Sequence, residues 1–387
     1  ALLPDMTPDP LPQPDLLPVP SPDTAPGEIP THRRRVRYAG KHPRHFAEKY
    51  KEKAPEQYAE DVARIVSSGK TLAGSHRSVL VPEILETLEP QPGQTLVDCT
   101  LGFGGHAREL LARLGTDGRL VGFDCDPVEL PKTTERLRQA GWSESQFIPV
   151  RSNFAGLGAG LASLGIQSVD GILADLGVSS MQLDDPARGF TYKDDGPLDL
   201  RMNPSKGLSA AQWLARTTPK QLATALRNNA DEPVAEALSE AIVAALQIQP
   251  ITRTREFARL LHELYRERGW TRDKPEGDAR IRRVFQALRI EVNDEFGVLD
   301  ALLRQLPACL KPNGRVAILT FHSGEDRRVK HAFAEGERLG LYTVVSDSVR
   351  RPGPEELRSN PRSAPAKLRW AIRSSTGAAD SDPTAEP

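Results

Sequence analysis

The chain has 387 residues, enough to bury a large core and to form more than one domain. Hydrophobic residues make up 38% of it, and no apolar run reaches the length of a membrane-spanning helix, so we expect no membrane partner. The three cysteines (Cys99, Cys125 and Cys309) lack CxxC spacing, which argues against a zinc site or a disulfide framework, and we expect no metal. The net charge of −1 is a sum over segments that differ in the sign of their charge.

Two polar segments precede the part expected to fold. Residues 1–31 hold ten prolines and neither Lys nor Arg, which predicts a disordered tail. They have neither the apolar core of a signal peptide nor the composition of a transit peptide, and we therefore expect a cytoplasmic protein. Residues 32–74 form a basic extension in which aromatic side chains lie among Lys and Arg. Such a segment suits contacts with phosphates and unpaired bases, and a solvated tail is the alternative.

Residues 75–183 alternate between strand and helix patterns. The expected helices are 76–88, 107–114, a stretch that ends near residue 140, and 153–164. The expected strands are 95–100, 119–123, 147–150 and 169–175. This alternation predicts an α/β fold with a parallel, doubly wound sheet.

The pattern then changes to helices without a strand candidate. Residues 184–282 are predicted to form an acidic loop and a helical insertion, a candidate RNA-recognition domain, with a mobile basic loop at 272–283. The sheet domain resumes over 283–374 with a long amphipathic pattern up to residue 310 and strands at 315–322, 342–346 and 366–372. Residues 375–387 form a polar tail that we expect to be disordered.

The stretch from Asp170 to Met202 combines a buried strand with a long polar loop. A buried strand ends at Asp175, and a long loop rich in Asp, Arg, Gly and Ser follows. Open α/β sheets bind ligands at the carboxyl ends of their strands, so this loop is a predicted site. The alternative is a solvated surface loop, but plain connections are usually shorter.

A glycine-rich turn follows the first strand. Gly102, Gly104 and Ala107 match the G-x-G-x-x-A form of the dinucleotide fingerprint, and Asp124 stands where a ribose-binding carboxylate belongs. A structural turn between strand and helix is the alternative.

Two features favour S-adenosylmethionine over NAD as the ligand. Asp98 lies on the first strand, where its carboxylate could hold the methionine ammonium. Residues 310–315 are typical of the approach to the fifth strand of a methyltransferase. Gly104 and Gly105 would let the backbone approach the amino-acid part of this ligand, because they carry no side chain.

Longer motifs carry a resemblance to a known family. They are His76…Val79-Leu80…Glu83, Thr100–His106, Asp170–Asp185 with Arg188–Phe190, Gly196–Asp199 with Arg201-Met202, Phe285–Ile290 with Asn293–Glu295, and Phe321–Ser323 with Glu325–Arg327. Over residues 73–373 the chain resembles the bacterial small-subunit ribosomal RNA cytidine-N4 methyltransferases (the RsmH or MraW family). Gly324, where this family usually has Leu, departs from the pattern.

The resemblance implies a Rossmann-like class I S-adenosylmethionine-dependent methyltransferase sheet with an inserted all-helical domain. It implies a cytidine in the decoding region of 16S rRNA as substrate, and hence the small ribosomal subunit as partner of a monomer or homodimer. The cofactor-binding residues that it implies are Gly104, Gly105, His106, Asp124, Phe154, Asp175 and Gln182. A ribosome-assembly factor that binds RNA and cofactor without turnover, and a methyltransferase with a non-RNA substrate, are the alternatives.

The implied reaction needs help from the protein, because the lone pair of the cytosine amine is delocalised into the ring. A carboxylate can align the amine and accept its hydrogen bonds. Many amino-methyltransferases use an Asp/Asn-Pro-Pro-aromatic motif after the fourth strand, where this chain has residues 175–178, DLGV. The catalytic candidates are Asp175, Asp199 and His322. Asp175 is either a contact to the adenine of the cofactor or the acceptor for the amine, and His322 is alternatively a structural loop residue.

Overall fold

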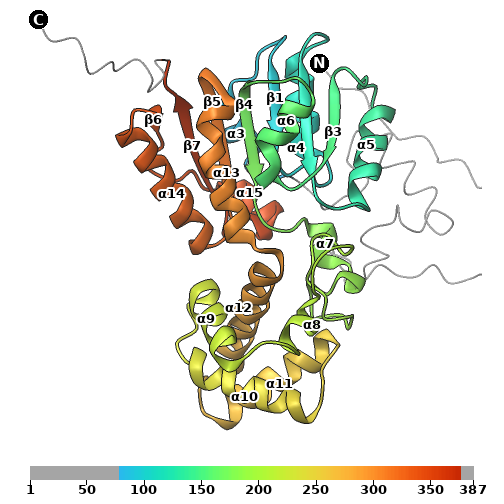
Figure 1. Cartoon of the computed structure of the whole chain (residues 1–387), viewed down its shortest axis with the longest axis vertical. Helices are drawn as coiled ribbons and strands as arrows, with labels where there is room; N and C mark the ends of the chain where they lie inside the picture. The colour runs from blue at the N-terminus through green and yellow to red at the C-terminus, as the bar shows by residue number, and fades with distance from the viewer. Residues whose placement is uncertain (1–77, 376–387) are drawn as a thin grey trace, which may run out of the picture. The chain divides into compact units, whose positions relative to one another are not determined.

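The computed structural model describes residues 78–375, and the expectations for the tails and the basic extension lie outside these residues. A seven-stranded sheet in the order β3-β2-β1-β4-β5-β7-β6 lies at the centre of the first domain (Figure 1). The strands are β1 (Thr95–Asp98), β2 (Arg119–Asp124), β3 (Phe147–Arg151), β4 (Val169–Asp175), β5 (Leu310–Thr320), β6 (Tyr342–Val345) and β7 (Lys367–Arg373).

The strand order reverses between β1 and β4, since β2 and β3 lie on one side of β1 and β4 and β5 on the other. Strands β1 to β5 are parallel. The parallel sheet predicted from residues 75–183 is confirmed for the strands of that range, whereas β7 runs in the opposite direction, because it is antiparallel to both β5 and β6. Strand β6 therefore points the same way as β5, and the chain connects β6 to β7 through a short helix, α15 (Pro354–Ser359), and a turn at Pro361–Ser363.

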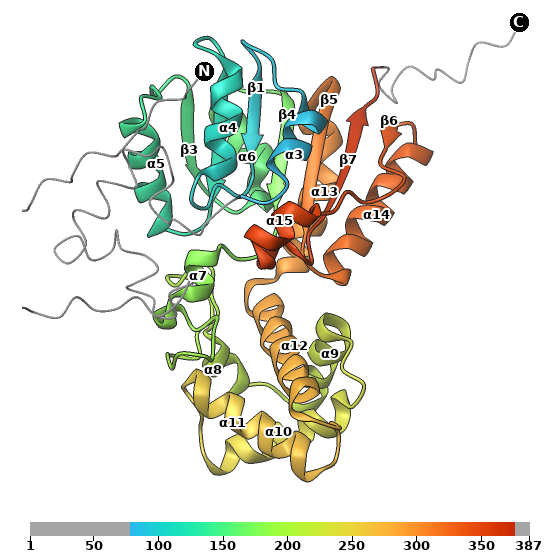
Figure 2. The same ribbon diagram turned by 180° about the vertical axis from the view of Figure 1, so that it is seen from behind.

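Helices cover both faces of the sheet because alternate residues of each strand point to opposite faces. Val97 and Val121 belong to a core with α6 (Leu157–Ser163), α13 (Glu295–Cys309) and α14 (Ser323–Arg338). Their neighbours Leu96 and Leu120 pack instead with α3 (Val81–Leu88), α4 (Gly105–Leu114) and α5 (Glu129–Gln139). Helices α6 and α13 lie in front of the sheet in Figure 1, and α3 and α4 in Figure 2.

A separate core belongs to the helical insertion, and residues from Phe190 to Leu288 form it. Its elements are α7 (Ser180–Asp184), α8 (Ala210–Leu214), α9 (Pro219–Ala230), α10 (Ala235–Ile248), α11 (Thr254–Glu267) and α12 (Lys274–Asn293). No helix within residues 78–375 is long and apolar enough to cross a membrane.

The expectation of a mobile loop at 272–283 is wrong, because helix α12 begins at Lys274. The Asp273 side chain accepts a hydrogen bond from the Glu276 amide, and a proline lies in the first turn, as is typical of helix starts. Helix α12 continues past residue 283, where the second part of the sheet domain was expected to begin.

A buried ion pair anchors α12 within the insertion. Arg280 donates to the Glu232 carboxylate, and the side chains of both are at most 5% exposed. The Tyr265 hydroxyl donates to Glu232 Oε2 at 3.1 Å, and the guanidinium of Arg280 lies over the Tyr265 ring. A basic residue can therefore lie in the core because a carboxylate 48 positions away compensates its charge.

Removing Glu232 should destabilise the helical domain. Glu232→Ala leaves the Arg280 charge buried without its partner, and we expect a loss of about 3–5 kcal/mol in the free energy of unfolding. Urea unfolding followed by circular dichroism measures this loss. Glu236→Ala is the control, because Glu236 is 63% exposed in its pair with Arg227 and should contribute less than about 1 kcal/mol. Equal, small effects of the two substitutions would contradict the role given to the buried pair.

Candidate functional site

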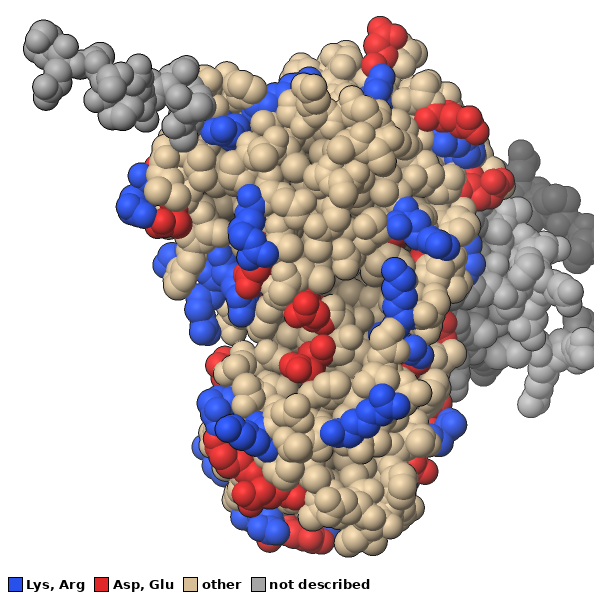
Figure 3. Space-filling model, in the orientation of Figure 1, with Lys and Arg blue, Asp and Glu red and all other residues tan. Residues whose placement is uncertain are grey.

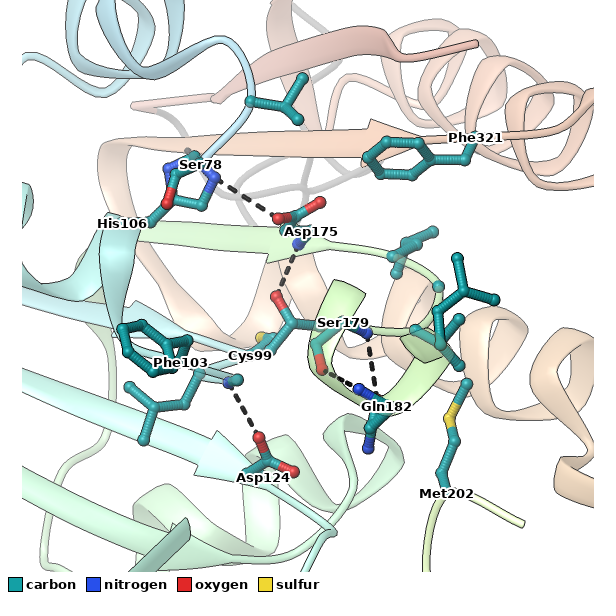
Figure 4. A pocket seen from close by; sticks show the side chains of 18 of the residues that line it. Ser78, Cys99, Phe103, His106, Asp124, Asp175, Ser179, Gln182, Met202 and Phe321 are labelled. Carbon is teal, nitrogen blue, oxygen red and sulfur yellow. Dashed lines mark hydrogen bonds and ion pairs between the residues drawn. The ribbon is translucent and has the colours of Figure 1, made fainter. Parts of the chain in front are cut away.

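A cavity of about 1820 Å³ opens where the carboxyl ends of β1, β2 and β4 meet the loops that follow them. Side chains of the helical insertion, including Met202, Arg282 and Gln286, form part of its lining. The reversal of strand order lies at this edge of the sheet, which is where doubly wound sheets bind their ligands. Figure 4 shows several of the lining residues.

The glycine-rich turn forms the floor beside β1. Gly102 has a φ of 48°, and its amide donates to Asp124 Oδ2 at 2.8 Å. Gly104, with a φ of 81°, caps the start of α4, and a β-carbon there would lie 2.9 Å from Thr133 Cγ2. A β-carbon at Gly105 would collide with Ser78 Oγ. The two glycines are thus needed first for the turn and for close packing, and Gly105 also lines the cavity whereas Gly104 lies behind it.

Asp124 ends β2 and faces the cavity. Besides the Gly102 amide, it accepts the Asp126 amide on Oδ1 at 2.8 Å. Burial raises the pKa of Asp124 to about 6, although these two amides act in the opposite direction. Each carboxylate oxygen keeps a second lone pair, so Asp124 can also accept hydroxyl groups of a ribose.

Asp175 ends β4 and is held from two sides. Its amide donates to Thr100 Oγ1 at 2.6 Å, which ties the end of β4 to the residues after β1. Its Oδ2 lies 3.4 Å from His106 Nε2, and both side chains line the cavity (Figure 4). Burial would lower the pKa of His106, but Asp175, Asp98 and Glu356 together raise it above its ordinary value. The three carboxylates thus stabilise the charged form of His106 relative to a free imidazole.

Asp98, which is predicted to hold the methionine ammonium, is not among the residues that line the cavity. It is 1% exposed, and its Oδ1 accepts the Thr100 amide at 3.0 Å. Its Oδ2 has no hydrogen-bond partner, and burial raises the pKa of Asp98 to about 6. Asp98 thus influences the site indirectly: its charge helps to raise the pKa of His106, and its carboxylate holds the Thr100 amide.

Phe154 and Gln182 both line the cavity. Phe154 begins the short turn after β3, where its ring packs against the core between α6 and α13. Gln182 forms a capping box with Ser179 at the start of α7 and donates to Asp126 Oδ2 at 2.9 Å. Its side chain amide is therefore partly used to hold the loop.

Two of the predicted catalytic residues have structural partners. Asp199 lies outside the cavity lining, and its carboxylate binds Arg201 through two bonds of 2.7 Å, so its predicted catalytic role stays a prediction. His322 lines the cavity but also caps α14, accepting the Glu325 amide on Nδ1 at 3.4 Å.

Within residues 78–375, one group of side chains has spacing that could suit a metal: Glu295, His322 and Glu325, with ligand atoms within 4.8 Å of one another. Arg289 already binds Glu295 with distances of 2.6 and 2.8 Å. Glu325 Oε2 accepts the Phe321 amide at 2.8 Å. The group is thus explained as an ion-pair network that joins α12, α13 and α14.

Two residues that support the site, Thr100 and Arg188, were not predicted as site residues. The Thr100 hydroxyl joins β1 to β4, and Arg188 donates to Asp126 Oδ2 at 2.7 Å and to the Met202 carbonyl oxygen at 2.8 Å. Both lie within motifs that carried the family resemblance. Their roles depend on partners that are far away in the sequence, so spacing alone could not reveal them.

The residues at this edge of the sheet fit S-adenosylmethionine. The cavity is large enough for the cofactor and a second ligand, Phe154 offers an aromatic face for adenine, and Asp124 offers acceptors for ribose. Glu83, whose buried Oε2 has no hydrogen-bond partner, adds a polar residue to the lining. Fold and site together define a class I, Rossmann-like methyltransferase that uses S-adenosylmethionine.

Comparison with known proteins identifies the family. The MraW methylase family matches residues 73–374. Ribosomal RNA small subunit methyltransferase H 1 of Lachnoclostridium phytofermentans is 46% identical over 348 residues, which cover 89% of this chain and 94% of that protein. Ribosomal RNA small subunit methyltransferase H of Thioalkalivibrio sulfidiphilus is 42% identical over 324 residues, which cover 79% of this chain and 99% of that protein. The chain belongs to the MraW methylase family.

Replacing Asp124 should weaken cofactor binding. We expect Asp124→Ala to lower the affinity for S-adenosylhomocysteine at least about tenfold, the usual effect of losing hydrogen bonds to a charged group. The ionised carboxylate is the better acceptor, so wild-type affinity should rise as pH increases through about 6 and level off above it. Calorimetry between pH 5 and 8 measures both effects.

The control is Asp117→Ala, which removes an exposed carboxylate from the loop before β2. Circular dichroism checks that both variants are folded. An Asp124→Ala protein that is folded and binds with wild-type affinity would remove Asp124 from the binding site.

Proposed function

We propose that this protein transfers a methyl group from S-adenosylmethionine to the N4 amine of a cytidine in the decoding region of 16S rRNA. The observation that carries the proposal is a carboxylate, Asp175, held rigidly at the end of β4 inside a cavity that also contains the glycine turn and Asp124. The two relatives described above are both named as small-subunit rRNA methyltransferases, which supports the proposal. The substrate would be the small ribosomal subunit or its RNA, in the cytoplasm, with the enzyme acting as a monomer or homodimer.

Each of the proposed binding residues would contact a different part of the cofactor. Phe154 would hold the adenine, Asp124 the ribose, and Gly105, His106 and Gln182 the remaining contacts around the glycine turn and α7. When bound, S-adenosylmethionine supplies an electrophilic methyl group. The chain's own contribution is to fix the two reactants and to exclude water from between them.

Asp175 is the proposed acceptor for the amine. The nitrogen becomes positively charged as it gains the methyl group, and a carboxylate within hydrogen-bond reach stabilises that charge. The Thr100 bond fixes the backbone of Asp175, and His106 fixes the direction of its carboxylate. A group placed in this way costs little reorganisation during the reaction.

The helical insertion is the proposed RNA-recognition domain. Its Lys206 and Arg282 line the cavity, where they can meet phosphates beside the target nucleotide. Figure 3 shows Lys and Arg spread over both parts of the visible face and interspersed with Asp and Glu. We infer that this face contacts RNA at separate points, with the target base drawn out of its stack to reach the cavity.

Asp175→Asn tests the proposed chemistry. The substitution keeps the shape but replaces a charged acceptor with a weaker one, and the rate of single-turnover methyl transfer to small subunits should fall by about 10²-fold or more. Affinity for S-adenosylhomocysteine, measured beside it, should stay near wild type. Asp170→Asn is the control, since it makes the same change at the other end of β4, where Asp170 binds Lys311.

The opposite pattern would contradict this role: if Asp175→Asn loses cofactor affinity but reacts at the normal rate once saturated, Asp175 is a binding residue only. Mass spectrometry of rRNA nucleosides tests the reaction itself. A strain that lacks the gene should lack N4-methylated cytidine in its small-subunit rRNA, and the wild-type gene should restore it. Restoration by the Asp175→Asn gene at the wild-type level would favour an assembly role without turnover.

A further inference from the structure

Phe321 is an aromatic residue of the cavity to which neither the fold nor the cofactor gives a role. It directly follows β5 and begins the Phe-His-Ser motif. The side chain is half-buried, lines the cavity, and packs at one edge against the core that includes Leu319 and Leu368. Within residues 78–375, its ring has no aromatic or cationic partner, so part of an apolar face is left for a ligand.

The backbone of Phe321 is fixed on both sides. Its amide donates to Glu325 Oε2 at 2.8 Å, and the preceding residue, Thr320, is the last of the β5 residues paired with β7. Burial would raise the pKa of Glu325, but His322, the Phe321 amide and Arg289 hold it below its ordinary value, so this acceptor is ionised at neutral pH. A ring on such a support loses little freedom when a ligand stacks on it.

The ring lies next to the loop that carries Asp175. Asp175 pairs with Leu319 across the β4–β5 ladder, and the Leu176 amide donates to the Leu319 carbonyl oxygen at 3.0 Å. A β-carbon on Gly177 would lie 4.0 Å from Phe321 Cδ2, an ordinary van der Waals distance, so the loop that follows Asp175 passes directly beside the ring. Figure 4 shows the ring projecting from the end of β5 toward Asp175.

The adenine of the cofactor is an unsuitable occupant for this surface. Phe154, the proposed adenine contact, follows β3, which is four strands from β5 in the sheet. At roughly 4.8 Å per strand the ends of β3 and β5 are on the order of 19 Å apart, a longer distance than one purine spans. The order across the sheet is instead Phe154, Asp124, Asp175 and Phe321, which leaves Phe321 beyond the methyl-accepting position.

We propose that Phe321 is the stacking surface for the cytosine base that receives the methyl group. This inference rests on the proposed function. A base drawn out of its RNA stack loses stacking on both faces, and an aromatic side chain replaces part of that loss while fixing the plane of the ring. With the plane fixed by Phe321, the exocyclic amine can point toward Asp175. The aromatic group missing from residues 175–178 is thus supplied by the neighbouring strand.

Substitutions of Phe321 can test this role, because they separate the effect of a flat aromatic face from that of side-chain volume. Phe321→Leu keeps the packing against the core but removes the flat face, and Phe321→Ala removes both. Each should lower single-turnover kcat/KM for small subunits isolated from a strain lacking the enzyme by roughly 10- to 100-fold, the range for loss of one stacked base. Phe321→Tyr should recover most of the rate, and affinity for S-adenosylhomocysteine should stay near wild type in all three.

The matched control is Trp142→Leu. Trp142 is another half-buried aromatic residue packed against the same core, but it does not line the cavity, so its substitution should leave kcat/KM unchanged. A Phe321→Leu enzyme as fast as wild type would overturn the proposal, and so would a loss of cofactor affinity that accounts for the slower rate. A wild-type enzyme that cannot methylate small subunits would instead overturn the proposed function.

Discussion

The hydrogen bond from the Asp175 amide to the Thr100 hydroxyl is the constraint on which the site depends. It joins the ends of β1 and β4, the two strands between which the order of the sheet reverses. Thr100 is held in turn by the buried carboxylate of Asp98, and His106 approaches the Asp175 side chain from the start of α4. A loop that follows a strand would otherwise be free to move, and this connection gives its carboxylate the rigidity that electrostatic stabilisation of a reaction requires.

The sheet also determines the order in which ligands can lie. Neighbouring parallel strands end at one edge, and the chain places a different chemical group after each: an aromatic ring after β3, a carboxylate at the end of β2, the Asp175 carboxylate on β4 and a second ring after β5. This succession suits a nucleoside at one end and a base at the other, with the reacting atoms between them. The helical insertion closes the far side of the cavity, where an RNA chain would have to approach.

Local patterns predicted the elements of the sheet because strand burial and glycine turns leave strong signals within a few residues. They failed where distant partners decide the outcome. The basic residues from 272 to 283 resemble a loop, yet Arg280 is buried because Glu232 neutralises it, and the segment becomes helix. The catalytic role of Asp199 stays a prediction, and the motif alone could not show that its carboxylate binds Arg201 outside the cavity lining. Asp98 is in the predicted place on β1, but its burial and its absence from the cavity lining depend on packing that the sequence does not reveal.

The proposed mechanism requires that Asp175 faces the reacting amine and does not hold the adenine of the cofactor. A crystal structure of the protein with S-adenosylhomocysteine would show which of the two groups Asp175 contacts. We expect adenine to lie against Phe154, Asp124 to bind the ribose, and the Asp175 carboxylate to be open toward the sulfur and Phe321. A hydrogen bond of about 2.6–3.2 Å between the Asp175 carboxylate and the adenine amino group would contradict it.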